Sequence, residues 1–142
     1  MDTQTQRKLE QLFDLLSLPP QRIAPRMRVT LAPCLLLVEV ATHGTREAQE
    51  APGVTLVLTL IDRAESAQRW LPLLLQTCAP EWSLGIPVRA CVALGRPMLI
   101  ATPPASDNSQ PVAWMACLAR MRRLLERIDA RQQRDAGAGG GA

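Results

Sequence analysis

The sequence predicts an α+β fold with the element order α-β-β-β-α-β-β-α. Three observations favour this order: apolar residues recur at helical spacing near both ends, strand-like apolar segments lie between them, and Gly or Pro residues separate the segments. The chain has 142 residues, which fits one domain of about 100–200 residues. We place that domain at residues 1–134 and expect the Gly/Ala-rich residues 135–142 to form a disordered tail.

The first predicted element is an amphipathic helix. Its apolar residues occur at positions i, i+3, i+4 and i+7, which places them on one helical face. They are Leu9, Leu12, Phe13 and Leu16. Pro19 and Pro20 then end the helix, because proline cannot continue the helical hydrogen bonding.

Three strands are predicted next. A short strand at Arg28–Leu31 is separated by Pro33 from a second strand at Cys34–Val40, which is apolar on both faces until Glu39. Residues 42–53 are polar and contain Gly and Pro, so we expect a loop. Alternating side chains in Val54–Ile61 predict the third strand.

The second helix begins with Asp62 and Glu65, whose spacing is that of a capping box. Ala67, Trp70, Leu71 and Leu74 continue it at helical spacing. Pro72 interrupts the pattern, and an interior proline costs a helix about 3 kcal/mol. We therefore expect either a kink at Pro72 or two shorter helical pieces.

A hairpin and a long helix complete the fold. Ile86–Leu94 and Met98–Thr102 form the hairpin around Gly95–Pro97. The last helix starts at Pro111, with Ser109 as its N-cap. A continuous apolar seam follows this helix at steps of four and three residues: Trp114, Leu118, Met121, Leu125 and Ile128.

Few residues offer catalytic chemistry. His43, the single histidine, falls in a Thr-His-Gly-Thr turn, where a solvated loop residue is the simplest interpretation. The four cysteines form no C-x-x-C pair and lie in apolar stretches, as core cysteines do. They are Cys34, Cys78, Cys91 and Cys117. Because no nucleotide-binding or HExxH motif is present either, we expect no enzymatic activity, metal or cofactor.

The net charge of +3 arises entirely in residues 110–142, which hold six arginines and three acidic residues. One interpretation is nucleic-acid binding by the last helix, and the other is the charged outer face of a core helix. The chain has no Tyr and one Phe, so base stacking has little to use. A membrane-spanning helix needs about 18 consecutive apolar residues, and no apolar run in the sequence is that long. Because no signal peptide is recognisable either, we expect a cytoplasmic protein.

Hydrophobic residues make up 47% of the chain, charged residues 20% and aromatic residues 3%. A small domain with this balance has more aliphatic surface than its own core can cover. Because exposed apolar patches usually mark partner sites, the composition favours a binding protein.

The order and length of these elements resemble the class I chaperones of bacterial type III secretion systems. The resemblance covers residues 3–131, from the amphipathic start Leu9-x-x-Leu12-Phe13-x-x-Leu16 to the closing helix at Pro111. It implies a bacterial, cytoplasmic, non-enzymatic homodimer with a curved, mainly antiparallel sheet of about five strands and three helices. Such chaperones hold the N-terminal segment of a secreted effector in extended form, and the ATPase of the secretion apparatus is a further candidate partner. Family members are typically acidic, whereas this chain is basic.

Carried over to this chain, the resemblance assigns two sets of residues. Effector contacts would fall on Leu9, Leu12, Phe13, Leu16, Leu36 and Val38. Dimer contacts would fall on Trp70, Leu74, Val88, Ala90 and Val92. Leu12 and Phe13 should then accept aspartate without unfolding. Every one of these residues can equally belong to the core, and a non-enzymatic adaptor or oligomeric scaffold remains the alternative function.

Overall fold

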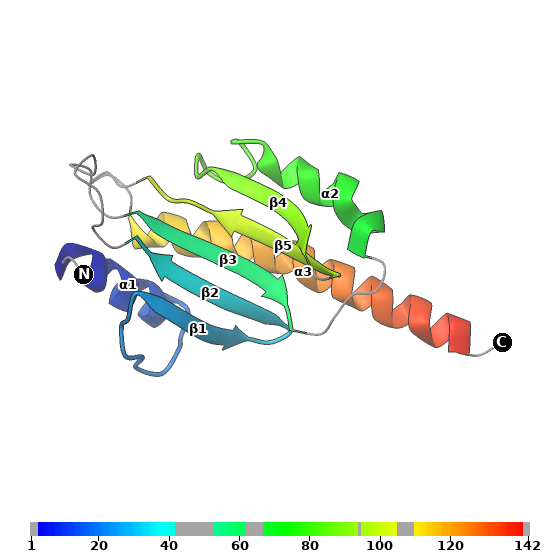
Figure 1. Cartoon of the computed structure of the whole chain (residues 1–142), viewed down its shortest axis with the longest axis horizontal. Helices are drawn as coiled ribbons and strands as arrows, with labels where there is room; N and C mark the ends of the chain where they lie inside the picture. Colours follow the sequence, from blue (N-terminus) through cyan, green and yellow to red (C-terminus); the bar gives the residue numbers. More distant parts are fainter. Residues whose placement is uncertain (1–2, 42–52, 62–66, 94, 105–109, 141–142) are drawn as a thin grey trace.

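The structure is a computed structural model that describes residues 3–41, 53–61, 67–93, 95–104 and 110–140. The element order is the predicted one (Figure 1). Helix α1 is Thr3–Leu15, and strands β1, β2 and β3 are Arg26–Leu31, Cys34–Val40 and Val54–Leu60. After a helical segment, β4 (Val88–Ala93) and β5 (Arg96–Ala101) lead into α3, Pro111–Gly140.

The five strands form one antiparallel sheet in the order β1-β2-β3-β5-β4. The α+β prediction is therefore confirmed. β3 joins the two hairpins, β1–β2 and β4–β5, because it pairs with β2 on one side and with β5 on the other. β1 and β4 are the edge strands of the sheet, so each is paired along one side only within the described residues.

Pro72 divides the second helix, which is one of the two outcomes that the sequence predicts. A 3₁₀ turn, Ala67–Trp70, leads into a single α-helical stretch, α2, Leu71–Leu75, and a further 3₁₀ turn covers Gln76–Cys78. Pro72 lies in the first turn of α2, where its missing N–H would have no helical acceptor. The predicted caps of this region and of α3 lie outside the described residues, namely Asp62, Glu65 and Ser109. So does His43.

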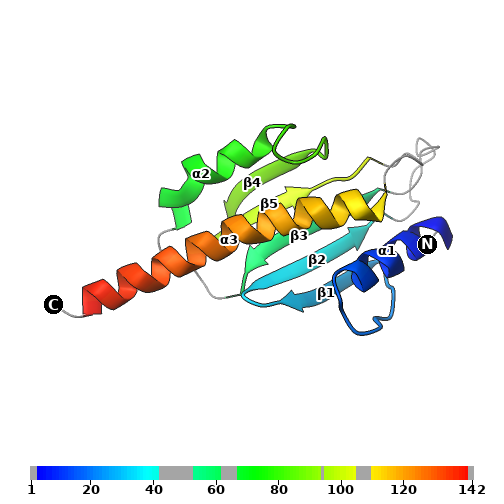
Figure 2. The ribbon, with the colours of Figure 1, turned by 180° about the vertical axis from the view of Figure 1, so that it is seen from behind.

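α3 extends further than the sequence predicts. It is helical as far as Gly140, into the segment for which a disordered tail is expected. Its C-terminal part projects beyond the sheet (Figures 1 and 2). Nothing in the composition of this segment explains the extension, because its glycines disfavour a helix by about 1 kcal/mol each relative to Ala.

The hydrophobic core lies between one face of the sheet and the three helices (Figure 2). Strand residues at alternate positions point into it, as the two-residue period of a strand requires. Those that are fully or almost fully buried include Leu36, Val38, Leu56, Leu58 and Leu99. α3 contributes the predicted seam to the same core, with Trp114, Leu118, Met121, Leu125 and Ile128 all buried.

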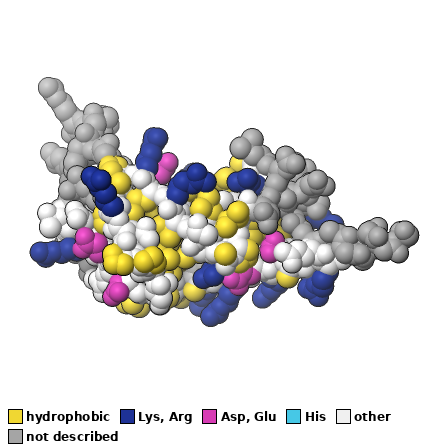
Figure 3. Space-filling view, turned by 90° about the horizontal axis from the view of Figure 1, so that it is seen from below, with side chains coloured by type: hydrophobic (Ala, Val, Ile, Leu, Met, Phe, Trp, Pro, Cys, Tyr) yellow, Lys and Arg dark blue, Asp and Glu magenta, His cyan; other side chains and the backbone are white. Residues whose placement is uncertain are grey.

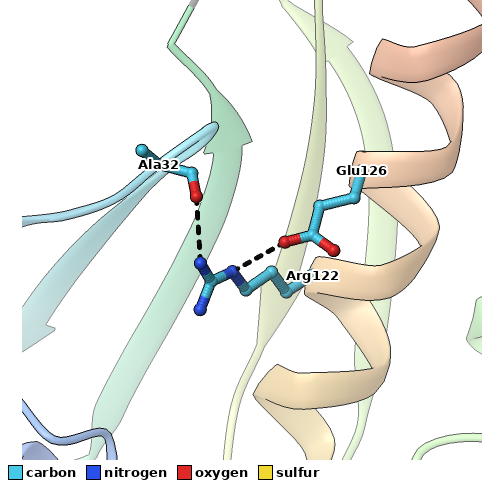
Figure 4. Close-up of polar contacts among 3 residues, drawn as sticks. All are labelled: Ala32, Arg122 and Glu126. Carbon is cyan, nitrogen blue, oxygen red and sulfur yellow. Dashed lines mark hydrogen bonds and ion pairs between the residues drawn. The ribbon is translucent and has the colours of Figure 1, made fainter.

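A polar contact also holds α3 to the sheet (Figure 4). Arg122 Nη2 donates a hydrogen bond of 2.9 Å to the Ala32 carbonyl oxygen, in the turn between β1 and β2. Arg122 Nε forms an ion pair of 3.0 Å with Glu126 Oε1, one helical turn along α3. The arginine is thereby oriented toward the β1–β2 turn, and this part of the basic helix has a structural use.

The sequence predicts that all four cysteines are core residues, which is confirmed for two of them and wrong for Cys78. Cys34 and Cys117 are buried, whereas Cys78 is exposed and Cys91 is half-buried. Burial raises the pKa of the Cys34 thiol to about 12, with a further increase from Glu126. Burial likewise raises the pKa of the Cys117 thiol to about 11.

We expect iodoacetamide at about pH 8 to label Cys78 in the native protein and to leave Cys34 and Cys117 unmodified, because alkylation requires an accessible thiolate. In urea all four cysteines should react. Peptide mass spectrometry after timed quenching measures each site separately. Native-state labelling of Cys34 at the rate of Cys78 would contradict the burial of β2.

Candidate partner-binding surfaces

The sheet has a second face that no helix covers within the described residues (Figure 1). Its apolar side chains are half-buried, and none of them belongs to the core cluster or packs against it. We call this surface the open face and define its apolar part by Leu35, Leu37, Val57, Met98 and Ile100. Uncovered apolar surface of this kind is typical of a protein-binding site.

Strand register places these residues in two rows across the sheet. In one row, Leu37 of β2 lies opposite Val57 of β3, and Val57 lies opposite Ile100 of β5. In the neighbouring row, Leu35 is opposite Thr59, and Thr59 is opposite Met98. Thr59 is buried, and its Oγ1 donates a 3.0 Å hydrogen bond to the Pro97 carbonyl oxygen. The hydroxyl is thus satisfied internally, which keeps the centre of the open face apolar.

Arginines border this apolar centre at both edges of the sheet. Arg28 of β1 is the cross-strand neighbour of Leu37, and Arg89 of β4 is the neighbour of Ile100. Arg26 and Glu39 face each other in the next β1–β2 pair on the same side. The open face therefore combines an apolar centre with a mainly positive border, which favours a partner segment that carries apolar and acidic side chains.

The residues expected to contact an effector lie on the opposite side of the sheet. The side chains of Leu9, Leu12, Leu36 and Val38 are 0% exposed, and that of Phe13 is 3% exposed. Leu16 is half-buried and packs against the same core. These six residues join α1 to the sheet inside one chain, so the core interpretation describes their place in the structure. A partner could contact the buried ones only if α1 moved away.

A groove does lie beside α1, on its outer side. It has a volume of about 580 Å³ and lies between α1 and the segment that leads to β1. Phe13, Leu18 and Ile23 form its apolar part, and Arg7, Glu10 and Asp14 add mixed charges. Figure 3, which looks onto the β1 side of the molecule, shows hydrophobic side chains exposed among basic ones. Phe13 is the one expected effector residue that lines this groove.

The residues expected at a dimer interface also have contacts within the chain. Trp70, Leu74 and Val88 are buried in the core, and Ala90 and Val92 are half-buried against it. They join the helical segment around α2 to β4. What remains accessible nearby is Leu75, whose side chain is 53% exposed, and the unpaired edge of β4. A dimer that uses this side of the molecule stays a prediction.

The open face was missed as a site at the level of sequence, although a signal was present. Cys34–Val40 is apolar on both faces up to Glu39, more than a strand needs when only one of its faces is buried. Leu35 and Leu37 are the second apolar face of this strand. The sequence could not show which face the helices cover.

Other classes of site find little support in the part of the chain that the structure describes. No group of three His, Cys, Asp or Glu residues there could hold a metal ion. Among the same residues, no helix combines the length and the apolar character that a membrane crossing requires.

Comparison with known proteins places the chain in one group. A family model described as SsaM matches residues 2–128, which covers the whole sheet, α1 and most of α3. A search of the curated proteins finds no match.

Proposed function

This chain belongs to the SsaM family, which is associated with type III secretion, and from that premise we propose that it is a chaperone for a secreted protein. In this proposal it binds the N-terminal segment of an effector in extended form and keeps that segment soluble and competent for secretion. It acts in the bacterial cytoplasm, as a homodimer and without enzymatic activity. The observation that carries the proposal is the open face, an apolar sheet surface that no helix of the described residues covers.

The chemistry of the open face suits a chain that has not folded. Leu37, Val57 and Ile100 offer apolar contact to side chains that would otherwise aggregate. Within the described part of the chain, the edge strands β1 and β4 are each paired on one side only, and an extended segment can add to such an edge through backbone hydrogen bonds. Backbone pairing tolerates many sequences, while the apolar rows and the arginine border select segments that carry apolar and acidic residues.

The proposal predicts that effector capture depends on the open face. The chain should be co-expressed with the N-terminal segment of a secreted protein encoded beside it, and soluble complex measured by co-purification. The double variant Leu37→Asp/Val57→Asp should lower the yield of complex by at least about tenfold, because it places two carboxylates in the apolar centre. Light scattering of the free protein and of the complex reports whether each is dimeric.

The matched control is Leu15→Asp/Val112→Asp. It makes the same two changes at side chains that are 38% and 55% exposed and that belong neither to the open face nor to the residues around α2 and β4. It should leave capture unchanged. Capture that survives in the open-face variant, with both variants folded by circular dichroism, would show that the effector binds elsewhere, and a monomer in light scattering would count against the homodimer.

A further inference from the structure

A second surface, separate from the open face, lies between α3 and the segment that follows α2. It is a groove of about 300 Å³, which we call the α2–α3 groove. Leu73 and Trp82 are half-buried, Leu124 is buried, and these three form its apolar floor. Three arginines of α3 form its wall: Arg120, Arg123 and Arg127.

The three arginines differ in what they contact. Arg120 Nη1 donates to the carbonyl oxygens of Glu81 and Trp82, so this side chain ties α3 to the turn beside the groove. Arg123 and Arg127 are exposed, and neither makes a hydrogen bond or ion pair within the described part of the chain. They are four residues apart, one turn of α3, and therefore stand side by side at the rim. Two cationic groups that have no partner among the described residues thus border an apolar floor.

We propose that the α2–α3 groove docks an acidic segment of a partner protein, with one apolar side chain seated on Leu73, Leu124 and Trp82. Carboxylates of the segment pair with Arg123 and Arg127, since planar guanidinium groups bind carboxylates through two parallel hydrogen bonds. The proposal gives a use to the basic excess of residues 110–142, and it does not depend on effector capture by the open face.

The charge of the rim and the apolar character of the floor favour an acidic segment over two other occupants, a nucleic acid and a second copy of the chain. A nucleic acid would place phosphates at the rim, but a sugar-phosphate chain makes poor use of the apolar floor formed by Leu73, Leu124 and Trp82. A second copy that docked through the same groove would bring arginines against arginines, which is unfavourable. An acidic segment with an apolar anchor satisfies both the rim and the floor.

The test uses fluorescence anisotropy with short labelled peptides and the full chain. The probe carries two Glu residues four positions apart with Leu between them, and its counterpart carries Lys in place of Glu. We expect the acidic probe to bind at least about tenfold more tightly than the basic one, and Arg123→Glu/Arg127→Glu to abolish that difference. Binding should also weaken as the salt concentration rises, because exposed charges are screened.

The charge-matched control is Arg7→Glu/Arg22→Glu, which reverses two exposed arginines that belong neither to the α2–α3 groove nor to the border of the open face, and it should leave the affinity within about twofold. An equal loss of affinity in this control would show that the effect depends only on the net charge of the protein, and it would overturn the proposal. So would equal binding of the two peptides or no binding of either. A DNA duplex that binds more tightly through Arg123 and Arg127, or a dimer that dissociates when they are reversed, would assign the groove to another occupant. None of these outcomes alters effector capture by the open face, so the two proposals fail separately.

Discussion

Replacing Leu36 by aspartate should leave no folded protein, whereas the same change at Leu37, the next residue of β2, should leave the fold intact. The side chain of Leu36 is 0% exposed and lies in the core, where an unpaired carboxylate costs several kcal/mol even after neutralisation. A domain of this size has a total stability of about 5–15 kcal/mol. Leu36→Ala, which introduces no charge, should still lower the free energy of unfolding by about 2–5 kcal/mol.

Leu37 differs because it points to the open face. It is half-buried, it packs against no core residue, and its cross-strand neighbour Arg28 would face the new carboxylate of Leu37→Asp. Urea unfolding followed by circular dichroism measures both variants. We expect Leu37→Asp to shift the free energy of unfolding by about 1 kcal/mol or less. Similar destabilisation by the two variants would mean that both faces of β2 are covered.

The second large effect is expected at α1. Leu12→Ala should lower the free energy of unfolding by about 2–5 kcal/mol, and Phe13→Ala by about 3–5 kcal/mol, since each change leaves a cavity between α1, α3 and the sheet. Leu12 is 0% exposed and Phe13 is 3% exposed. Leu12→Asp/Phe13→Asp should therefore unfold the chain, contrary to the expectation that both residues accept aspartate.

Leu15→Ala is the matched control for α1. Leu15 is in the same helix, but its side chain is 38% exposed, so its truncation should cost only about 0.5 kcal/mol. Thermal melts of Leu12→Ala and Leu15→Ala at equal concentration compare the two positions directly. If Leu12→Ala melts like Leu15→Ala and loses only effector capture, α1 is a binding helix that docks loosely on the sheet.

The residues that the resemblance assigns to effector contacts lie in the core or against it, and α1 shows why the sequence alone did not reveal this. The apolar positions of α1, from Leu9 to Leu16, share one face, and that observation is correct. An amphipathic stripe shows that a helix has a face to bury, and it is the same for a core contact and for a partner contact. In this chain the apolar stripe of α1 packs on α3 and the sheet.

Local sequence determined the order of the elements, and it placed the strand boundaries to within a few residues. Cys34–Val40 forms a strand as predicted, α3 begins at Pro111, and Pro72 divides the second helix. These features depend on residues close together in the chain: side-chain periodicity, proline geometry and turn residues. The seam from Trp114 to Ile128 is buried for the same reason, since only one face of a long helix can meet the sheet.

Only the tertiary structure decided which faces are covered. β2 and β3 have apolar residues on both sides, and nothing local distinguishes Leu36 from Leu37. The difference arises because α1, α2 and α3, which come from distant parts of the chain, pack on one side of the sheet. Periodicity orders side chains relative to one another along an element, whereas burial depends on where other elements dock. The open face and the α2–α3 groove therefore result from how the elements dock, and not from the periodicity within any one element.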